Sequence, residues 1–242
     1  MNHILVLYML VIIPMLSTLQ YFSLKKDGST ANKQRMYLVT IVLMGIGTIA
    51  VALILPAGEV VSFHEQVAIP GFVHLLFGCT IAFLIITFIV PVALVLTQNR
   101  EFLDKVREQY APKSFVLPVN IEERRLFLLF ALFVGVGEEM MFRSFLARYI
   151  HALPFDWSWL VSFLVAALLF GLVHFHQGAG GMFNAFLIGI CFSYLFIVTG
   201  HLWLPIILHI VYDLKVVLIS RSIYRSGDHT KGLDNAGSGQ SL

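Results

Sequence analysis

Six ionisable residues in the C-terminal half of the chain have the types and the spacing that hydrolytic chemistry needs. They occur in the sequences EEMMFR, FGLVH and HIVYD, and they are Glu138, Glu139, Arg143, His174, His209 and Asp213. Carboxylates and imidazoles are the side chains that enzymes use most often as general acids and bases. The sequence therefore predicts a site in which a carboxylate activates a water molecule.

The two adjacent glutamates are expected to have different roles. On an α-helix Glu139 and Arg143 are four residues apart and share a face, whereas Glu138 points about 140° away from Arg143. We expect Arg143 to neutralise Glu139 and to leave Glu138 free as a general base or a metal ligand. A buried ion pair that only fixed the packing of helices would need one Glu and one Arg, so the second glutamate favours chemistry.

Each histidine has a partner at helical spacing. Phe170 and His174 lie four residues apart, and so do His209 and Asp213, so each pair shares one face of a helix. An Asp one turn from a His can fix the tautomer of the imidazole or act beside it as a ligand. One such pair is weak evidence, but acids and histidines on three apolar segments rarely coincide by chance.

The same residues leave the use of a metal open. Glu138, His174, His209 and Asp213 could supply the set of imidazoles and carboxylates that a catalytic divalent metal such as zinc takes. The sequence has no HExxH, the usual zinc signature. A neutral Asp213 could donate a hydrogen bond to an oxyanion, whereas an ionised one could not. We favour activation of water by Glu and His without a metal, and keep the metal as the alternative.

The segments that hold these residues are too apolar for a water-soluble protein. Of the 242 residues, 58% are hydrophobic and 12% are charged, whereas a typical soluble domain is about 25% charged. This composition excludes a soluble enzyme and a disordered protein, and a net charge of +2 is too small to indicate a nucleic-acid partner. The sequence predicts an all-α, polytopic transmembrane bundle, whose principal partner is the lipid bilayer.

Runs without charged residues predict about seven spans, since a crossing needs roughly 20 apolar residues. Residues 157–212 contain no Asp, Glu, Lys or Arg, and Gly-rich or Pro-containing breaks divide this stretch. The first span is expected to be retained, because no signal-peptide pattern precedes it. The predicted spans are 4–24, 36–58, about 71–97, 126–150, 158–175, 182–199 and 204–222.

The basic residues predict the orientation of the chain. Thirteen of the sixteen Lys and Arg fall in alternate connections or in the tail, and only Arg148 lies on the opposite side. Positive charge is retained in the cytoplasm, so we expect the N-terminus outside and the C-terminus in the cytoplasm. The expected parts are 1–100 with three spans, a cytoplasmic loop at 101–123 that includes most of an amphipathic helix at 100–110, a catalytic membrane core at 124–222, and a disordered cytoplasmic tail at 223–242.

The depths of the site residues give one geometric condition. At about 1.5 Å per residue, Glu138 lies roughly 18 Å along its span from the cytoplasmic side. His174 falls near the cytoplasmic end of its own span. The two depths agree only if the helices tilt or if the helix of Glu138 begins near Ile121.

The three motifs resemble those of the CAAX prenyl protease and bacteriocin-processing (CPBP) family of intramembrane endopeptidases, also grouped with the Abi proteins. EEMMFR is similar to EExxxR, FGLVH to FxxxH and HIVYD to HxxxN/D, in the same order and over about residues 120–220. The sequence GHLWLP at 200–205 is also typical. Eukaryotic CAAX endopeptidases have Asn at the position of Asp213. The acidic residue found here also occurs in bacterial relatives. This departure bears on the prenyl-protein substrate and not on the proteolytic core.

The resemblance implies an intramembrane endopeptidase of a bacterial plasma membrane. Its substrate would be a membrane-associated protein or peptide, such as a prenylated protein or a bacteriocin or pheromone precursor. Carried over by motif, Glu138 would activate the attacking water with help from His174. Glu139, held by its ion pair, would shape the site. His209 and Asp213 would stabilise the oxyanion or bind a metal.

Two other classes of function remain open on the sequence. One is a non-proteolytic membrane immunity or regulatory protein that binds a partner. The other is a small proton-coupled transporter that uses the buried acids, although the chain shows no repeat between its halves. Substitution of Glu138 distinguishes the three, because it would abolish cleavage, leave a binding phenotype intact, or stop proton flux.

Overall fold

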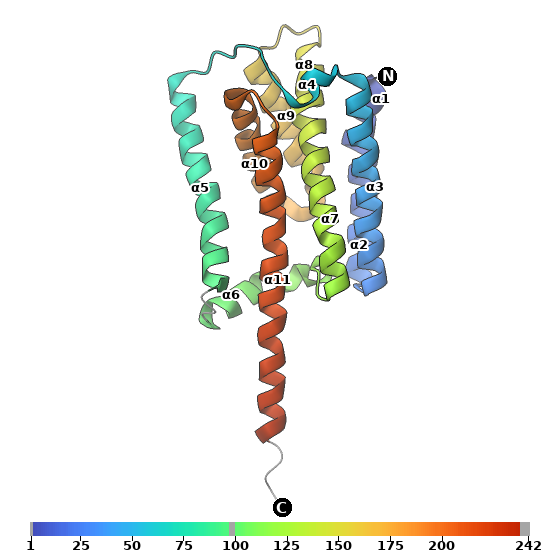
Figure 1. Cartoon of the computed structure of the whole chain (residues 1–242), viewed down its shortest axis with the longest axis vertical. Helices are drawn as coiled ribbons and strands as arrows, with labels where there is room; N and C mark the ends of the chain where they lie inside the picture. Colours follow the sequence, from blue (N-terminus) through green and yellow to red (C-terminus); the bar gives the residue numbers. More distant parts are fainter. Residues whose placement is uncertain (1, 97–99, 238–242) are drawn as a thin grey trace, which may run out of the picture.

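The computed structural model of the chain describes residues 2–96 and 100–237, and this part is almost entirely helical. Its long helices pack side by side along one axis (Figure 1). The described ranges contain no strand, and the pairing of Ser62 with His201 is an isolated bridge. The predicted all-α class is confirmed.

Each predicted span overlaps a helix, although the span 36–58 crosses the break between α3 and α4 at Leu55 and Pro56, and residue 97, the last of the third span, lies outside the described residues. The π-helical segments are η1 and η3, and the 3₁₀ segments are η2 and η4. In chain order the elements are α1 (Asn2–Leu7), η1 (Tyr8–Ile12), α2 (Ile13–Lys26), α3 (Thr30–Ile54), α4 (Ala57–Val61), α5 (Gly71–Leu96), α6 (Arg100–Tyr110), η2 (Ala111–Val116), α7 (Ile121–Glu138), η3 (Glu139–Leu146), α8 (Ala147–His151), α9 (Trp159–Val173), η4 (Phe175–Gln177), α10 (Gly178–Thr199) and α11 (Trp203–Gly237).

Several helices are long and apolar enough to cross a membrane. By length and composition these are Asn2–Lys26, Thr30–Ile54, Phe175–Thr199 and Trp203–Arg221. Helix α9 is equally apolar, but its 15 residues extend only about 22 Å, which is less than the roughly 30 Å of a hydrocarbon core. A multi-pass membrane protein is confirmed, whereas the count of seven spans and the orientation stay predictions.

Helix α3 illustrates why the bundle needs a lipid surround. One face buries Tyr37, Met44 and Val51, all less than 4% exposed. The outer face carries large apolar side chains at helical spacing, namely Leu38, Val42, Ile46, Ile49 and Leu53. A continuous apolar surface of this kind is costly in water and costs nothing against acyl chains.

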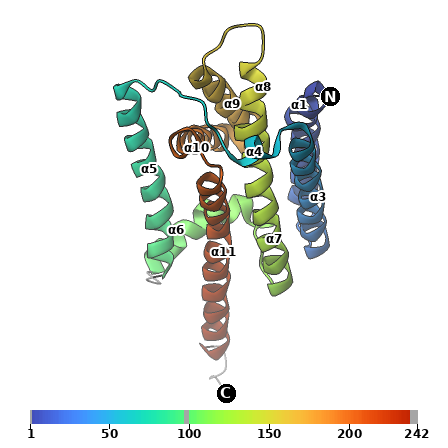
Figure 2. The ribbon, with the colours of Figure 1, turned by 45° about the horizontal axis from the view of Figure 1, so that its top comes forward.

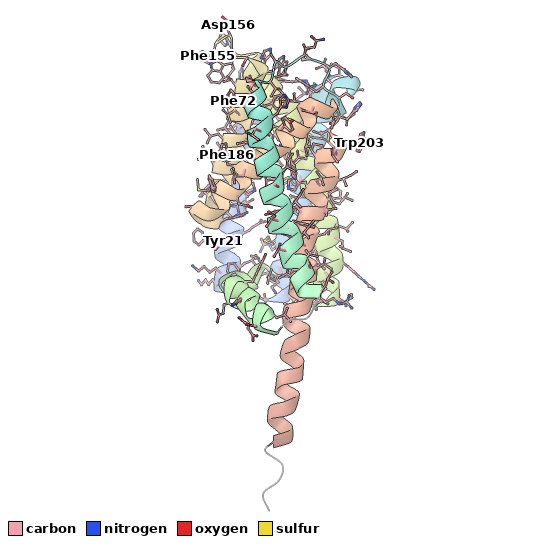
Figure 3. All side chains as sticks on the ribbon, turned by 90° about the vertical axis from the view of Figure 1, so that its left-hand side faces the viewer. Tyr21, Phe72, Phe155, Asp156, Phe186 and Trp203 are labelled. Atoms are coloured by element: carbon pink, nitrogen blue, oxygen red, sulfur yellow. The ribbon has the colours of Figure 1, made fainter. Side chains whose placement is uncertain are left out.

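One end of the bundle gathers the basic residues. Figure 1 shows the end of α2, the start of α3 and the start of α7 at the lower end, with α6 lying across it. We call this the basic end; Lys25, Lys26 and Lys33 belong to it. The N-terminus lies at the opposite end, and so do Phe155 and Asp156 in the loop before α9 (Figures 1 and 3). The amphipathic helix predicted at 100–110 is confirmed as α6.

Helix α7 begins at Ile121 because Asn120 caps it. The side-chain oxygen of Asn120 accepts a hydrogen bond from the Glu123 N–H at 2.8 Å, which satisfies one of the free donors of the first turn. The depths of Glu138 and His174 were expected to agree if this helix begins near Ile121, and it does begin there. The turn between α9 and α10 also stops above the level of α6 (Figures 1 and 3).

Two glycines let α7 lie close to its neighbours. Helix α7 packs between α3 and α11, and Figure 2 shows α5 and α3 on opposite sides of this pair. A Cβ added at Gly135 would lie 2.6 Å from Cγ1 of Ile210 on α11, and one at Gly137 would lie 3.1 Å from Cβ of Met44 on α3. The missing side chain at Gly135 thus brings the end of α7 against α11.

The C-terminal segment differs from its sequence prediction. Composition predicts disorder from residue 223, whereas α11 continues to Gly237. Extending an existing helix adds one hydrogen bond for each residue that is fixed, so elongation is far easier than nucleation, and no proline interrupts this stretch. The last residues of the predicted tail, 238–242, lie outside the described part of the chain.

Candidate active site

A single buried carboxylate oxygen forms the centre of the site. Oε1 of Glu139 lies 3.0 Å from Nη1 of Arg143, and the two side chains are 0% and 1% exposed. The same oxygen lies 2.7 Å from Nδ1 of His209, which arrives from α11. The predicted pairing of Glu139 with Arg143 is confirmed, and it extends to a histidine 70 residues away.

Glu138 faces the other nitrogen of the same imidazole. Its Oε2 lies 3.6 Å from Nε2 of His209, and Oδ2 of Asp213 lies 3.9 Å from that nitrogen. The side chains of Glu138 and Asp213 retain 13% and 23% exposure, more than the core of the site. The imidazole of His209 therefore contacts Glu139 through Nδ1, while its Nε2 faces the carboxylates of Glu138 and Asp213.

The hydrogen bonds fix the tautomers of both histidines. An ionised carboxylate only accepts hydrogen bonds, so Nδ1 of His209 carries a proton and donates it to Glu139. Nδ1 of His174 lies 2.7 Å from the carbonyl oxygen of Phe170, and because a carbonyl only accepts, this nitrogen also donates. Both imidazoles thus present Nε2 as the free position. Spacing alone allows Asp213 either to fix the tautomer of His209 or to act beside it as a ligand; in the structure Glu139 contacts Nδ1 and Asp213 lies nearer Nε2.

Phe170 connects the arginine with the second histidine. The guanidinium carbon of Arg143 lies 4.3 Å from the centre of the Phe170 ring and 5.7 Å from that of Phe192. The Phe170 ring is also in edge contact with His174, with ring centres 4.8 Å apart. A cation over an aromatic face is stabilised by the quadrupole of the ring, so Phe170 supports Arg143 and positions His174.

The backbone changes its winding at the two glutamates. Helix α7 ends at Glu138, and the π-helix η3 begins at Glu139 and buries all of its residues through Leu146. Short π segments interrupt α-helices frequently at functional sites. The rule of 100° per residue that underlies the predicted geometry therefore holds up to Glu138 and not beyond it.

Comparison with known families agrees with this geometry. The family described as type II CAAX prenyl endopeptidase, Rce1-like, matches residues 121–215. This match supports the assignment of residues 121–215 to the CAAX protease family. The matched segment, which we call the CAAX-protease core, starts with α7 and ends just after Asp213, so it contains all six predicted site residues. Searches among curated proteins and solved structures find no significant match.

The CAAX-protease core leaves polar atoms of its central ion pair unused. Within the described part of the chain, Oε2 of Glu139 and both Nη atoms of Arg143 are buried without a hydrogen-bond partner. Nη1 is engaged in the ion pair with Oε1, so Oε2 and Nη2 are the two atoms left without a polar contact. Proteins rarely leave such groups unsatisfied, and each exception calls for an explanation. Two exceptions on one ion pair mark a place that can accept a further polar group.

The donor atoms of the CAAX-protease core were also compared with the needs of a metal. Among the residues that the structure describes, no group of three or more His, Cys, Asp or Glu could hold a metal ion. The four residues considered as ligands, Glu138, His174, His209 and Asp213, do not form such a set. Activation of water by Glu and His without a metal therefore stays a prediction.

The CAAX-protease core also contains neighbours of the candidate site that the sequence did not reveal. Nδ2 of Asn184 on α10 donates to the hydroxyl of Tyr212 at 2.9 Å, and Nζ of Lys215 lies 3.3 Å from the centre of the Tyr212 ring. These contacts tie α10 to α11 directly beside Asp213. The ring of Phe192 lies near the guanidinium of Arg143. Because Phe192 lies in an uninterrupted apolar run, the sequence alone does not distinguish it from residues that face lipid.

Proposed function

We propose that the chain is an intramembrane endopeptidase that hydrolyses a peptide bond of a membrane-associated protein or peptide, with Glu138 as the base that activates water. One observation carries the proposal. The carboxylate of Glu139 is occupied by Arg143 and His209, which leaves Glu138, more exposed than Glu139, as the glutamate beside the free nitrogen of His209. Membership of the CAAX protease family supports the reaction class.

In the first step, the carboxylate of Glu138 takes a proton from a water molecule. The water oxygen attacks the carbonyl carbon of the scissile peptide bond and forms a tetrahedral intermediate. His174 helps to orient this water, because its Nδ1–H is fixed on the Phe170 carbonyl and Nε2 is left as an acceptor. General base catalysis of this kind contributes about 10²–10⁴-fold to the rate.

In the second step, the negative charge on the former carbonyl oxygen is stabilised by His209 and Asp213. A protonated His209 donates from Nε2, and its positive charge is balanced by Glu139 on Nδ1. Asp213 in its neutral form adds a second donor, as Asn would in the eukaryotic enzymes that the motif resembles. Donors fixed in advance around an oxyanion are usually the largest single contribution to such catalysis.

In the third step, the intermediate collapses and the carbon–nitrogen bond breaks. The proton that Glu138 took from water passes to the departing nitrogen, so the products are a carboxylic acid and an amine. Glu138 returns to its ionised form for the next cycle. No group other than water is consumed.

The proposed substrate class is the C-terminal segment of a prenylated protein, because the family description names CAAX prenyl endopeptidases. Bacteriocin and pheromone precursors are the other membrane-associated peptides that the family resemblance suggests. The test uses the full chain in liposomes with a fluorescent prenylated CAAX peptide and with the same peptide lacking the prenyl group. We expect cleavage of the prenylated peptide by the wild type and none by Glu138→Gln.

Cleavage of both peptides at equal rates would contradict the prenyl assignment while leaving an endopeptidase. Equal cleavage by the wild type and by Glu138→Gln would overturn the mechanism. Glu122→Gln is the matched control, because it removes one exposed carboxylate from the start of the same helix. It is expected to cleave at the wild-type rate.

We also propose that the bundle crosses a bacterial plasma membrane seven times, with the basic end in the cytoplasm. The segregation of the basic residues supports this orientation. Single cysteines at Lys26 and Asp156, in a chain whose own Cys79 and Cys191 are replaced, would be labelled from opposite sides of the membrane. Labelling of both from the same side would contradict the topology.

A further inference from the structure

A cavity outside the candidate active site lies between the first turns of α7 and the middle of α11. Its volume is about 330 Å³, and it is lined by Ile121, Arg124, Arg125, Leu128, Val217, Leu218 and Arg221. The lining combines three arginines from two helices with four aliphatic side chains. This cavity lies at the basic end, where α7 begins.

Among the described residues, no acidic side chain forms an ion pair with the arginines of this cavity. In the described ranges, no ion pair involves Arg124, Arg125 or Arg221, and Nε of Arg124 is buried without a hydrogen-bond partner. The nearest buried acid in the sequence, Glu123, is instead engaged by Lys33. A buried guanidinium donor without an acceptor is costly, so the cavity is suited to an anion that brings oxygen atoms.

The aliphatic part of the cavity faces outward. Ile121, Leu128 and Leu218 are 60%, 49% and 44% exposed, and Arg221 is the last residue of the candidate span Trp203–Arg221. The arginines therefore lie where an apolar helix surface ends, and Leu128, Val217 and Leu218 continue from them along that surface. This order of charge and apolar surface matches an amphiphile with an anionic head and hydrocarbon tails.

We propose that this cavity binds the phosphate group of an anionic phospholipid, with its acyl chains along Leu128, Val217 and Leu218. Guanidinium groups bind phosphate oxygens in a bidentate manner, and basic pockets between transmembrane helices on the cytoplasmic side suit lipid headgroups. The lipid would bridge α7, which carries Glu138, to α11, which carries His209. It would thus hold together the two helices whose contact forms the active site.

The test measures lipid binding directly and does not depend on protease activity. The full-length protein in detergent is titrated with phosphatidylglycerol, with phosphatidylcholine and with inorganic phosphate, and the bound species are counted by native mass spectrometry. We expect phosphatidylglycerol to bind at least about tenfold more tightly than phosphatidylcholine. Each Arg→Gln substitution in the cavity should weaken this binding about fivefold, the effect of one basic residue near an anionic surface.

The control removes the same charge from elsewhere at the basic end. Lys25→Gln, Lys26→Gln and Arg35→Gln together leave the cavity intact, and this variant should bind phosphatidylglycerol as the wild type does. If the triple variant Arg124→Gln, Arg125→Gln, Arg221→Gln does not fold, the single variant Arg125→Gln, at an exposed position, provides the measurement.

Three results would overturn the proposal. The first is equal affinity for phosphatidylglycerol and phosphatidylcholine. The second is an equal loss of binding in the cavity variants and in the control, which would indicate a diffuse surface charge. The third is inorganic phosphate binding as tightly as the lipid, which would assign the cavity to a free anion.

Discussion

Two buried ion pairs on the same helical segment invite comparison. Glu123 pairs with Lys33 at the start of α7, and Glu139 pairs with Arg143 just beyond its end. All four side chains are at most 6% exposed. By burial and charge alone the two pairs are equivalent, yet their surroundings differ.

The first pair is satisfied by the backbone. Nζ of Lys33 donates to the carbonyl of Leu117 at 3.0 Å, and Oε2 of Glu123 accepts from the N–H of Val119 at 2.7 Å. The pair closes the chain segment before α7 onto the start of α3. These contacts indicate a structural role.

The second pair shares its contacts with a histidine and leaves atoms unused. Oε1 of Glu139 is shared between Arg143 and His209, while Oε2 of Glu139 and Nη2 of Arg143 are buried without partners among the described residues. The two pairs differ in the degree of hydrogen-bond satisfaction and not in burial, so we expect the first pair to hold the fold and the second to serve the proposed site.

The largest effect is expected for Glu139→Gln. The amide can offer its NH₂ instead of an acceptor to His209 and carries no charge to balance an imidazolium, and an analogous change in a catalytic triad lowers the rate about 10⁴-fold. We expect cleavage per folded molecule to fall at least about 10²-fold, measured with the peptide assay. Wild-type cleavage by Glu139→Gln would show that this pair is structural, like the first.

Lys33→Met should reverse the pattern. Removing one partner of a buried pair costs about 3–5 kcal/mol of stability, because Glu123 is left without its cation. The melting temperature of the protein in detergent should fall, while cleavage per folded molecule stays within about twofold of the wild type, as expected when a substitution lies far from the reacting groups. A loss of cleavage in fully folded Lys33→Met would remove the distinction between the pairs.

The dependence of stability on pH tests the structural role of the first pair. Glu123 precedes the predicted span, so its carboxylate lies outside the membrane-spanning segment. Burial alone raises the pKa of Glu123, but the Val119 N–H, the Thr30 hydroxyl and the Lys33 ammonium outweigh it and lower the pKa below its ordinary value. A lowered pKa stabilises the folded state at neutral pH, and this contribution is lost as the pH falls through the ordinary glutamate range.

The stability of the wild type should therefore approach that of Glu123→Gln as the pH is lowered. Thermal unfolding of both proteins from pH 7 to pH 3 measures this difference. A difference that stays constant, or that grows in acid, would contradict the assignment of an ionised Glu123.

The smallest effect is expected from metal removal. Because the described site residues form no metal-holding set, treatment of the purified protein with a chelator should leave cleavage unchanged. Loss of cleavage that is restored by added zinc would instead make Glu138, His174, His209 and Asp213 candidates for ligands, and would weaken the role of Glu138 as a base.

The sequence predicts which residues form the site better than it predicts the contacts between them. Charge is so scarce in the apolar segments that Glu138, Glu139 and Asp213 stand out as the acids within predicted spans, and the spacing of Glu139 and Arg143 predicts their ion pair. The contact of Glu139 with His209 joins two helices, and local spacing carries no information about such a contact. For the same reason the spacing of His209 and Asp213 leaves open whether Asp213 fixes the tautomer or acts as a ligand, and it gives no sign of Glu139 on Nδ1.

Backbone details also escape the sequence. Nothing in EEMMFRSFL distinguishes a π-helix from an α-helix, because the difference of one residue in the hydrogen-bond ladder depends on packing against neighbouring helices. The sequence also gives no sign that Gly135 matters. Its role in the close packing of α7 is evident only from the structure, where Ile210 of α11 lies against it. The helical segments themselves follow from apolar runs, since a bilayer leaves backbone groups no partners other than their own.

The central claim is that Glu138 performs the chemistry while the ion pair at Glu123 only holds the fold. The most direct measurement compares the peptide termini in membranes of cells that produce the wild type, Glu138→Gln or Glu123→Gln, each normalised to folded protein. The account predicts termini that appear with the wild type, persist with Glu123→Gln and vanish with Glu138→Gln. Termini that persist with folded Glu138→Gln would contradict it.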